Sequence, residues 1–340
     1  MSWIDRVLEA FGRQGAREEL AAGYGLSTFC GPSSARRRQV KLTQAVLRGA
    51  LRPIADSFGD DVPFLLLKGQ PLQEILYEGR YLRPTGDIDL LVLPGDIEAA
   101  RRRLVALGYR SKWAEGPRMW VHNQEPFIHG DHGIIAELHW SVAEPQMPQP
   151  AVGRLFEDSS VFELGDDLNV RVLSPTWQLF GAVLHFHHHM GFAKGLVDVA
   201  AWLDQFGADC DEAEILGRAG RLGMYGMLQW PLHTIARLVG ERPPLWEAEA
   251  DGFVRAWAAA SASAMRRCLV RGARNELEAS LVAIMPRVGP VRGVGLRAAS
   301  MLVADGGVGA KARACARVVV EGPHFLGRFL WRDKSKGDRG

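Results

Sequence analysis

The sequence predicts an α+β protein in which a small unit with a mixed sheet is followed by a larger, all-helical domain. Of its 340 residues, 47% are hydrophobic, which is enough to form buried cores and excludes disorder as the main state. Short apolar runs of strand length dominate between positions 62 and 173, whereas helical periodicity prevails beyond position 176. We therefore predict a helical segment at 1–60, an α/β core at 61–174, and a helical C-terminal domain with a basic tail at 175–340.

The first 60 residues carry a helical pattern. Leu20 and Ala21 lie in an early helical segment, and apolar residues repeat every three or four positions over 40–54. The pattern then changes to a strand over 62–67 and a short helix over 72–77. These elements open the predicted α/β core.

The middle of the core continues with a second strand over 88–93. Pro94, Gly95 and Asp96 predict a turn and a helix N-cap, after which a helix runs over 97–107 and ends at Gly108. Further strand candidates occupy 109–113, 119–122, 126–129, 134–140 and 170–173.

Two turn signals separate these later strands. The stretch 130–133 reads Gly-Asp-His-Gly, which is typical of a hairpin, and Pro145, Pro148 and Pro150 mark a loop. Helical periodicity follows, and Gly-rich breaks near 289–295 and 306–309 divide the tail. The predicted helices cover 179–189, 196–206, 213–222, 225–239 and 253–269.

Several classes of protein are excluded by composition. The apolar runs, such as 281–285, are far shorter than the ~20 residues that cross a bilayer, so no membrane span is predicted. Asp5 and Glu9 lie where a secretory signal would be apolar or basic. The four cysteines are widely spaced and form no Cys-x-x-Cys pair, which argues against a zinc knuckle or a disulfide framework. We expect a cytoplasmic protein.

The formal net charge of +2 hides two opposed halves. Residues 251–340 hold 16 basic and 7 acidic side chains, so this tail carries +9 and the remainder is acidic. Arg313, Arg317 and Arg328 lie among apolar residues of the tail. The tail either contacts RNA or another anionic acceptor, or forms a basic amphipathic helix packed on its own domain.

The strongest chemical signal is a pair of acids on one predicted strand. Asp87 and Asp89 are two residues apart, so their side chains project from the same face while Ile88 projects from the other. At about 4 Å and an effective dielectric near 20, two like charges repel by roughly 4 kcal/mol. A divalent cation with a preference for oxygen ligands, such as Mg²⁺ or Mn²⁺, removes this repulsion.

A third acid and a glycine turn fit the same chemistry. If the strand that contains Glu137 neighbours the strand of Asp87, three carboxylates converge, an arrangement that suits two-metal phosphoryl transfer. The Lys68-Gly69-Gln70 turn lies between a strand and a helix. Glycine permits a close approach of phosphate to the backbone, and a helix N-terminus supplies free N–H donors.

These motifs together resemble the polymerase-beta-like nucleotidyltransferase superfamily. The chain has the Lys-Gly turn, an Arg-x-x-x-Asp-Ile-Asp-Leu strand beginning at Arg83, and a later acid two residues before His139. Within the superfamily it is most similar to the bacterial uncharacterised nucleotidyltransferases, which in turn resemble toxin-type nucleotidyltransferases. The resemblance covers about residues 60–205.

The resemblance implies a Mg²⁺-dependent enzyme that transfers a nucleoside monophosphate from an NTP such as ATP to an acceptor hydroxyl or phosphate, with release of pyrophosphate. The acceptor would be RNA, a protein or peptide, or a small molecule. By position, the resemblance implies Gly69 and Gln70 at the phosphate turn, Asp87 and Asp89 as metal ligands, and Glu137 as the third, catalytic carboxylate.

Two departures from the superfamily pattern motivate a second hypothesis. Gln70 replaces the usual Ser of the turn, and Glu137 replaces the usual Asp. A module that binds NTP for regulation without turnover would tolerate both changes.

Further candidates have two interpretations each. Arg83 and Lys68 either bind phosphates or are solvated charges. Lys194 and Asp198, four residues apart, form either an ordinary helix pair or a contact in which Lys194 faces the nucleotide from the second domain.

A third hypothesis, a metallohydrolase, rests on a histidine cluster. His185 and His189 share a helix face at metal-ligand spacing, but Phe186 replaces the Glu that a zincin requires. The alternative is a structural or substrate-facing helix, in which His185 and His189, like Asp198, are second-domain contacts.

Overall fold

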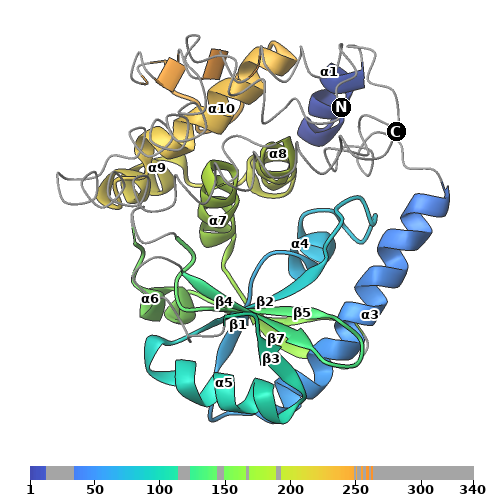
Figure 1. Cartoon of the computed structure of the whole chain (residues 1–340). Coiled ribbons are helices and arrows are strands. Elements are labelled where there is room, and N and C mark those ends of the chain that lie inside the picture. Colours follow the sequence, from blue (N-terminus) through green and yellow to red (C-terminus); the bar gives the residue numbers. More distant parts are fainter. Residues whose placement is uncertain are drawn as a thin grey trace, which may run out of the picture.

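The computed structural model describes residues 1–12, 34–113, 123–143, 149–165, 168–188, 193–248 and 250, together with 254, 255, 258, 259 and 262. A seven-stranded mixed sheet lies between helices, and further helices stack above one of its faces (Figure 1). This arrangement confirms the predicted α+β fold class. The predicted boundaries at residues 60 and 174 stay predictions, and the basic tail lies outside the described residues.

The sheet has the strand order β3-β4-β5-β2-β1-β7-β6. The β2–β5 and β1–β7 pairs are parallel, and the other pairs are antiparallel. The strand that carries the paired acids, β2, therefore lies in the middle of the sheet beside β5. The strands are β1 (Phe64–Leu66), β2 (Asp87–Val92), β3 (Tyr109–Ser111), β4 (Gln124–His129), β5 (Ile135–His139), β6 (Ser160–Glu163) and β7 (Asn169–Val172).

The alternation of side chains along β2 separates chemistry from packing. Ile88, Leu90 and Val92 are buried in the core on one face of the sheet. Leu91 belongs to the core on the other face, so Asp87 and Asp89, which alternate with Ile88 and Leu90, share that second face. A strand that is buried on both faces leaves little room for charge, which makes the two acids exceptional.

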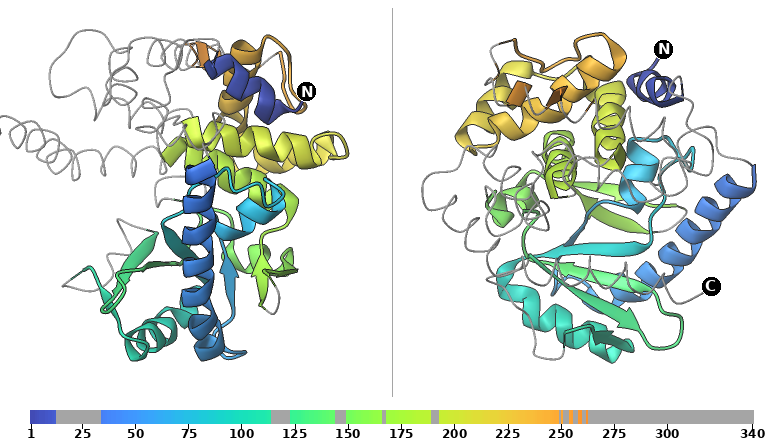
Figure 2. Two further views of the ribbon diagram at one scale, coloured as in Figure 1. Left: turned by 90° about the vertical axis from the view of Figure 1, so that its right-hand side faces the viewer. Right: turned by 45° about the horizontal axis from the view of Figure 1, so that its top comes forward.

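Two helices cover the first face of the sheet. They are α3 (Ser34–Phe58), which runs along the sheet in Figure 2, and α5 (Ile97–Ala106), which follows the short 3₁₀ turn η2 (Pro94–Asp96). Leu51 and Phe58 of α3 and Leu104 of α5 join the same core as Ile88 and Leu90. Helices α3 and α5 thus cover the face opposite to Asp87 and Asp89 and do not occupy the face that carries these two acids.

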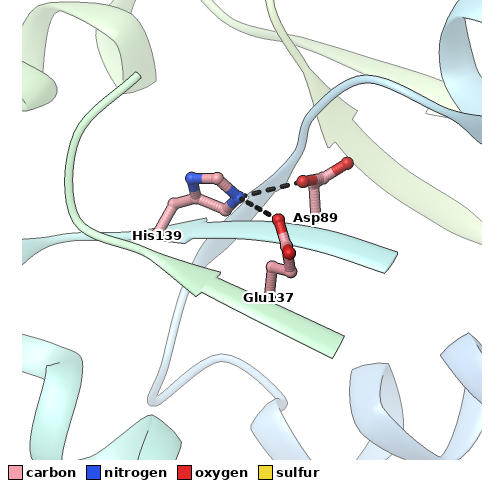
Figure 3. A group of neighbouring side chains, drawn as sticks. All are labelled: Asp89, Glu137 and His139. Carbon is pink, nitrogen blue, oxygen red and sulfur yellow. Dashed lines mark hydrogen bonds and ion pairs between the residues drawn. The ribbon is translucent and has the colours of Figure 1, made fainter. Parts of the chain in front are cut away.

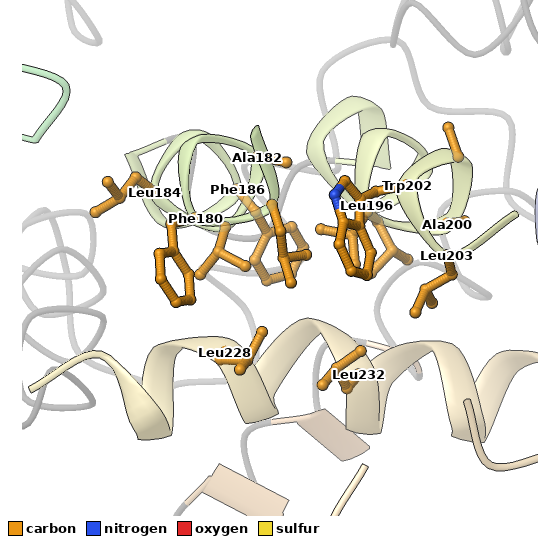
Figure 4. Close-up of a cluster of buried hydrophobic side chains, with 14 of the residues drawn as sticks. Phe180, Ala182, Leu184, Phe186, Leu196, Ala200, Trp202, Leu203, Leu228 and Leu232 are labelled. Atoms are coloured by element: carbon orange, nitrogen blue, oxygen red, sulfur yellow. The ribbon is translucent and has the colours of Figure 1, made fainter. Parts of the chain in front are cut away.

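The remaining helices lie on the side of the second face (Figure 1). These are α4 (Gln70–Ile75), α7 (Pro175–His188), α8 (Ala193–Phe206), α9 (Glu212–Arg221), α10 (Tyr225–Val239) and α1 (Trp3–Gly12), with α6 (Val152–Glu157) between β5 and β6. Helices α7 and α8 lie between the sheet and α9 and α10. In Figure 4, α7 and α8 lie side by side on α10, and Phe186 packs edge-on against Trp230. No helix in the described ranges has the length and apolar character that crossing a membrane requires.

The contact between α7 and α8 is close because of one glycine. A Cβ added at Gly195 would lie 2.8 Å from the Cα of Phe186. The same apolar core joins these helices to Leu65, Leu67 and Leu91 of the sheet region. The helices are therefore fixed directly above the acidic face of β2.

The N-terminal helix α1 is tied to α8 by one carboxylate. Asp204 accepts hydrogen bonds from the backbone N–H groups of Trp3 and Ile4, the latter at 2.8 Å. In Asp204→Asn an NH₂ group replaces one of the two carboxylate oxygens, so only one of the two N–H donors keeps its acceptor. We expect the free energy of unfolding to fall by about 1 kcal/mol. Urea denaturation measures this change, and an unchanged midpoint would show that the cap contributes nothing.

The elements differ from the predictions at a few places. The predicted strands at 134–140 and 170–173 and the helices from 179 to 239 are present with shifted ends. Helix α6 and strand β6 were not predicted. Strand β6 is an edge strand with Val161 exposed, and it is held in place by its pairing with β7. The predicted segments around Leu20, at 119–122 and over most of 253–269 lie outside the described residues.

Candidate active site

A cavity of about 400 Å³ lies between the acidic face of the sheet and helices α4, α7 and α8. Its walls include most of the predicted site residues: Lys68, Arg83, Asp87, Asp89, Glu137, His185, Lys194 and Asp198. Gly69 and Gln70 adjoin the cavity in sequence but do not line it, and His189 lies outside the described residues. The fold thus gathers charged side chains from both halves of the described structure into one place.

The centre of the cavity is formed by paired positions of β2 and β5. Asp89 lies opposite Glu137 in the parallel register, so their side chains share a face. His139 Nε2 lies 2.9 Å from Asp89 Oδ1 and 3.7 Å from Glu137 Oε2 (Figure 3). Ligand atoms of these three residues all lie within 4.8 Å of one another. Gln124 Nε2 donates to Glu137 Oε2 at 2.7 Å and fixes the carboxylate from β4.

This cluster fits a divalent cation. It offers two carboxylates and an imidazole, and Asp87 lines the same cavity as a further oxygen donor. Burial and the negative charges of Asp89 and Glu137 raise the pKa of Asp87, against the opposing charges of Lys68 and Lys194. A bound cation would offset the repulsion among the three carboxylates.

His139 was quoted in the sequence motif but was not predicted as a site residue. The available signal was its position two residues after Glu137, which places both on one face of β5. Burial alone would lower the pKa of His139, but the hydrogen bonds to Asp89 and Glu137 outweigh it and raise the pKa. His139 therefore belongs to the cluster and holds the Asp89 carboxylate in place.

Replacing His139 tests this role. His139→Asn removes the imidazole that contacts Asp89, and we expect Mn²⁺ affinity to fall by about 10- to 100-fold. Titration calorimetry with Mn²⁺ measures the change, with His132→Asn in the exposed hairpin as the matched control. Equal Mn²⁺ affinities of His139→Asn and the wild type would remove His139 from the metal cluster.

Lys68 brings a cation to the same carboxylate. Its Nζ lies 2.9 Å from Asp89 Oδ1. Burial would lower the pKa of Lys68, but the charges of Asp89 and Glu137 raise it overall, so the lysine is protonated. Burial would raise the pKa of Asp89, yet Lys68 and His139 hold it well below its usual range.

The turn after Lys68 requires glycine. Gly69 has φ +59°, and a Cβ there would lie 2.7 Å from Thr85 Cγ2. Gln70, the first residue of α4, is buried, with an exposed fraction of 3%. Neither the nitrogen nor the oxygen of its side-chain amide has a hydrogen-bond partner in the described part of the chain. Phosphate binding by Gly69 and Gln70 stays a prediction.

Arg83 has a partner within the protein. Its Nε lies 2.8 Å from Asp198 Oδ1, and its Nη2 lies 3.1 Å from Oδ2, so the guanidinium grips the carboxylate with two bonds. His185 Nδ1 lies 3.8 Å from the same carboxylate. The predicted roles of Arg83 and His185 toward a substrate stay predictions.

Lys194 lines the cavity from α8. Arg83 and burial lower its pKa to about 8, against the opposing effects of Asp198 and Asp87. No ion pair joins Lys194 to Asp198 within the described ranges, so the ordinary helix pair is not formed there. The second interpretation, in which Lys194 faces a ligand, is consistent with its position.

Fold and site together define a protein with an acidic cluster, whose donor set suits a divalent cation, beside cationic side chains in a cavity between a mixed sheet and helices. The chain belongs to the family described as uncharacterised nucleotidyltransferases, whose family model matches residues 33–240. The match extends from the start of α3 to the end of α10 and includes every residue of the cluster. A comparison with curated proteins found no match. Membership supports a transferase with a nucleotide substrate, while the wider superfamily and the toxin similarity stay predictions.

Proposed function

We propose that the protein transfers a nucleoside monophosphate from an NTP to an acceptor hydroxyl or phosphate and releases pyrophosphate. The observation that carries this proposal is the convergence of Asp89, Glu137 and His139 from adjacent strands, with Asp87 and Lys68 in the same cavity. The proposed cation is Mg²⁺, with Mn²⁺ as an alternative. Carboxylate oxygens favour either ion.

The cations of the cavity would bind the triphosphate. Lys68, two residues after the end of β1, and Lys194 of α8 both line the cavity that contains the acidic cluster. The lining also includes apolar side chains that suit a nucleobase: Leu72, Val142, Val172, Leu173 and Ala182. The cavity therefore offers both charged and apolar side chains, as a nucleotide requires.

The acids would hold the cation and move a proton. Asp87, Asp89 and Glu137 are the proposed metal ligands, and a bound divalent cation would neutralise phosphate charge during transfer. Glu137, which is 19% exposed, would accept the proton of an acceptor hydroxyl. The acceptor oxygen forms a bond to the α-phosphorus, the bond from that phosphorus to the bridging oxygen breaks, and pyrophosphate leaves.

Radiolabelled substrates test the proposal. The purified full chain would be incubated with Mg²⁺ or Mn²⁺, each α-labelled NTP, and candidate acceptors drawn from RNA, peptides and small alcohols. We expect one acceptor to gain the label together with release of pyrophosphate. Metal-dependent NTP binding with no transfer to any acceptor class would favour the second candidate below.

The second candidate is a regulatory module that binds NTP without turnover. The observation that favours it is Gln70, whose buried amide replaces the usual Ser of the turn and does not line the cavity. Calorimetry that detects Mg-NTP binding, combined with no pyrophosphate release, would support it. Any acceptor-dependent pyrophosphate release that exceeds background would exclude it.

A further inference from the structure

A buried ion-pair network lies beside the acidic cluster. Arg83 and Asp198 are 2% and 1% exposed, and the two bonds between them measure 2.8 and 3.1 Å. Tyr77 donates its hydroxyl hydrogen to Asp198 Oδ1 at 2.6 Å. Arg83 and Asp198 are 115 positions apart in the chain, so the network joins two segments that are distant in sequence.

On the core side, the network holds the segment that supports the glycine turn. The backbone N–H of Arg83 donates to Gln73 Oε1 at 3.0 Å, and Nη1 donates to Thr85 Oγ1 at 3.4 Å. Thr85 is the residue that leaves no space for a Cβ at Gly69. Arg83 therefore links α4, the turn and the start of β2.

On the helical side, the network holds α8. Asp198 lies one helical turn after Lys194, and both line the cavity. Lys68 and Arg83 have carboxylate partners at 2.9 and 2.8 Å, whereas no ion pair of Lys194 is found among the residues described. The proximity of Arg83 and burial lower the pKa of Lys194 to about 8, and an anion in the cavity would oppose both effects.

A buried ion pair is a weak source of stability, because desolvation of both charges offsets much of their attraction. What a two-bond Arg–carboxylate contact supplies is a fixed geometry. The close approach of α8 to α7 at Gly195, next to Lys194, shows that little space exists for an alternative placement. The network is thus suited to fix where the start of α8 lies.

We propose that Asp198 and Arg83 are positioning residues, whose buried ion pair fixes α8 so that Lys194 stands in the cavity beside the acidic cluster and binds the phosphates of the substrate. The inference rests on the proposed function, because it takes a polyphosphate as the ligand of Lys194. It gives Arg83 a role through Lys194 rather than a direct contact with phosphate.

Inorganic tripolyphosphate with Mg²⁺ is the probe, because it does not depend on which base the enzyme selects. Titration calorimetry would compare the wild type, Lys194→Met, Asp198→Asn and the double variant. We expect each single variant to weaken binding about tenfold, and the double variant to bind no more weakly than Lys194→Met. Charge alone predicts the opposite sign for Asp198→Asn, since removing a negative charge favours a polyanion, so weaker binding reports on position.

Two further variants separate positioning from general damage. Asp204→Asn changes the same chemical group on the same helix but lies outside the cavity lining, so it should leave tripolyphosphate affinity unchanged. Arg83→Lys keeps the charge but cannot form the two-bond contact, and it replaces Asp198→Asn if that variant does not fold. Thermal melting would confirm that each tested variant is folded.

The outcomes distinguish this inference from the proposed function. If Asp198→Asn binds as tightly as the wild type or more tightly, or if its effect adds fully to that of Lys194→Met, the positioning role is overturned. If Lys194→Met binds Mg-tripolyphosphate as tightly as the wild type does, the positioning role is also overturned, but the proposed function is not. Absence of any Mg-tripolyphosphate binding by the wild type would instead contradict the proposed function.

Discussion

Replacing both Asp87 and Asp89 by asparagine is expected to reduce nucleotidyl transfer about 10³-fold or more, because metal-ion catalysis contributes several kcal/mol of transition-state stabilisation. The fold should persist. Burial and neighbouring carboxylates raise the pKa of Asp87, so its ionised form is unfavourable in the folded protein and a neutral side chain there relieves repulsion. Asparagine at position 89 still offers an oxygen to Lys68, which remains partly exposed to water.

The measurement is initial transfer rate at saturating NTP, with thermal melting of each variant. A matched control carries Asp60→Asn and Asp61→Asn, two exposed acids in the loop after α3, and should transfer at the wild-type rate. A double variant at 87 and 89 that transfers label as fast as this control would show that the acidic cluster is not the catalytic centre.

Replacing Lys68 by methionine is expected to raise the affinity for Mn²⁺ and to lower the affinity for Mg-tripolyphosphate. The ammonium group lies 2.9 Å from Asp89 Oδ1, where it competes with a divalent cation for the same carboxylate. Without it, Mn²⁺ alone should bind about tenfold more tightly, whereas Mg-tripolyphosphate should bind about tenfold more weakly because a phosphate partner is lost.

Titration calorimetry at one pH measures both affinities for the same preparation. Lys112→Met, which removes an exposed lysine after β3, is the matched control and should change neither. If both affinities fall together in Lys68→Met, the lysine supports the structure of the site, and its role as a phosphate ligand is contradicted.

Much of the fold could be predicted from the sequence because most of its helices and strands are marked by local sequence patterns. The hairpin between β4 and β5 follows from turn residues between apolar runs, and α7 to α10 follow from a helical period. Helix α6 and strand β6 were missed because their stability comes from contacts distant in sequence. Ser160 pairs with Val172, and no pattern within 152–163 reveals that pairing.

Part of the acidic cluster could be predicted from the sequence for a related reason. The two-residue period of a strand fixes that Asp87 and Asp89 share a face, whatever the rest of the sheet does. That Glu137 lies opposite Asp89 required the parallel pairing of β2 with β5, which the sequence permits but does not specify. The Arg83–Asp198 contact joins positions 115 residues apart and has no local signal at all.

The position of the transferred label distinguishes nucleotidyl transfer from transfer of the terminal phosphate. The wild-type protein would be given NTP labelled at the α-phosphate in one reaction and at the γ-phosphate in another, with Mg²⁺ and the acceptor found in the screen. We expect the α-label to enter the acceptor and the γ-label to leave in pyrophosphate. Entry of the γ-label into the acceptor, with release of NDP, would define a phosphotransferase and overturn the proposed nucleotidyl transfer.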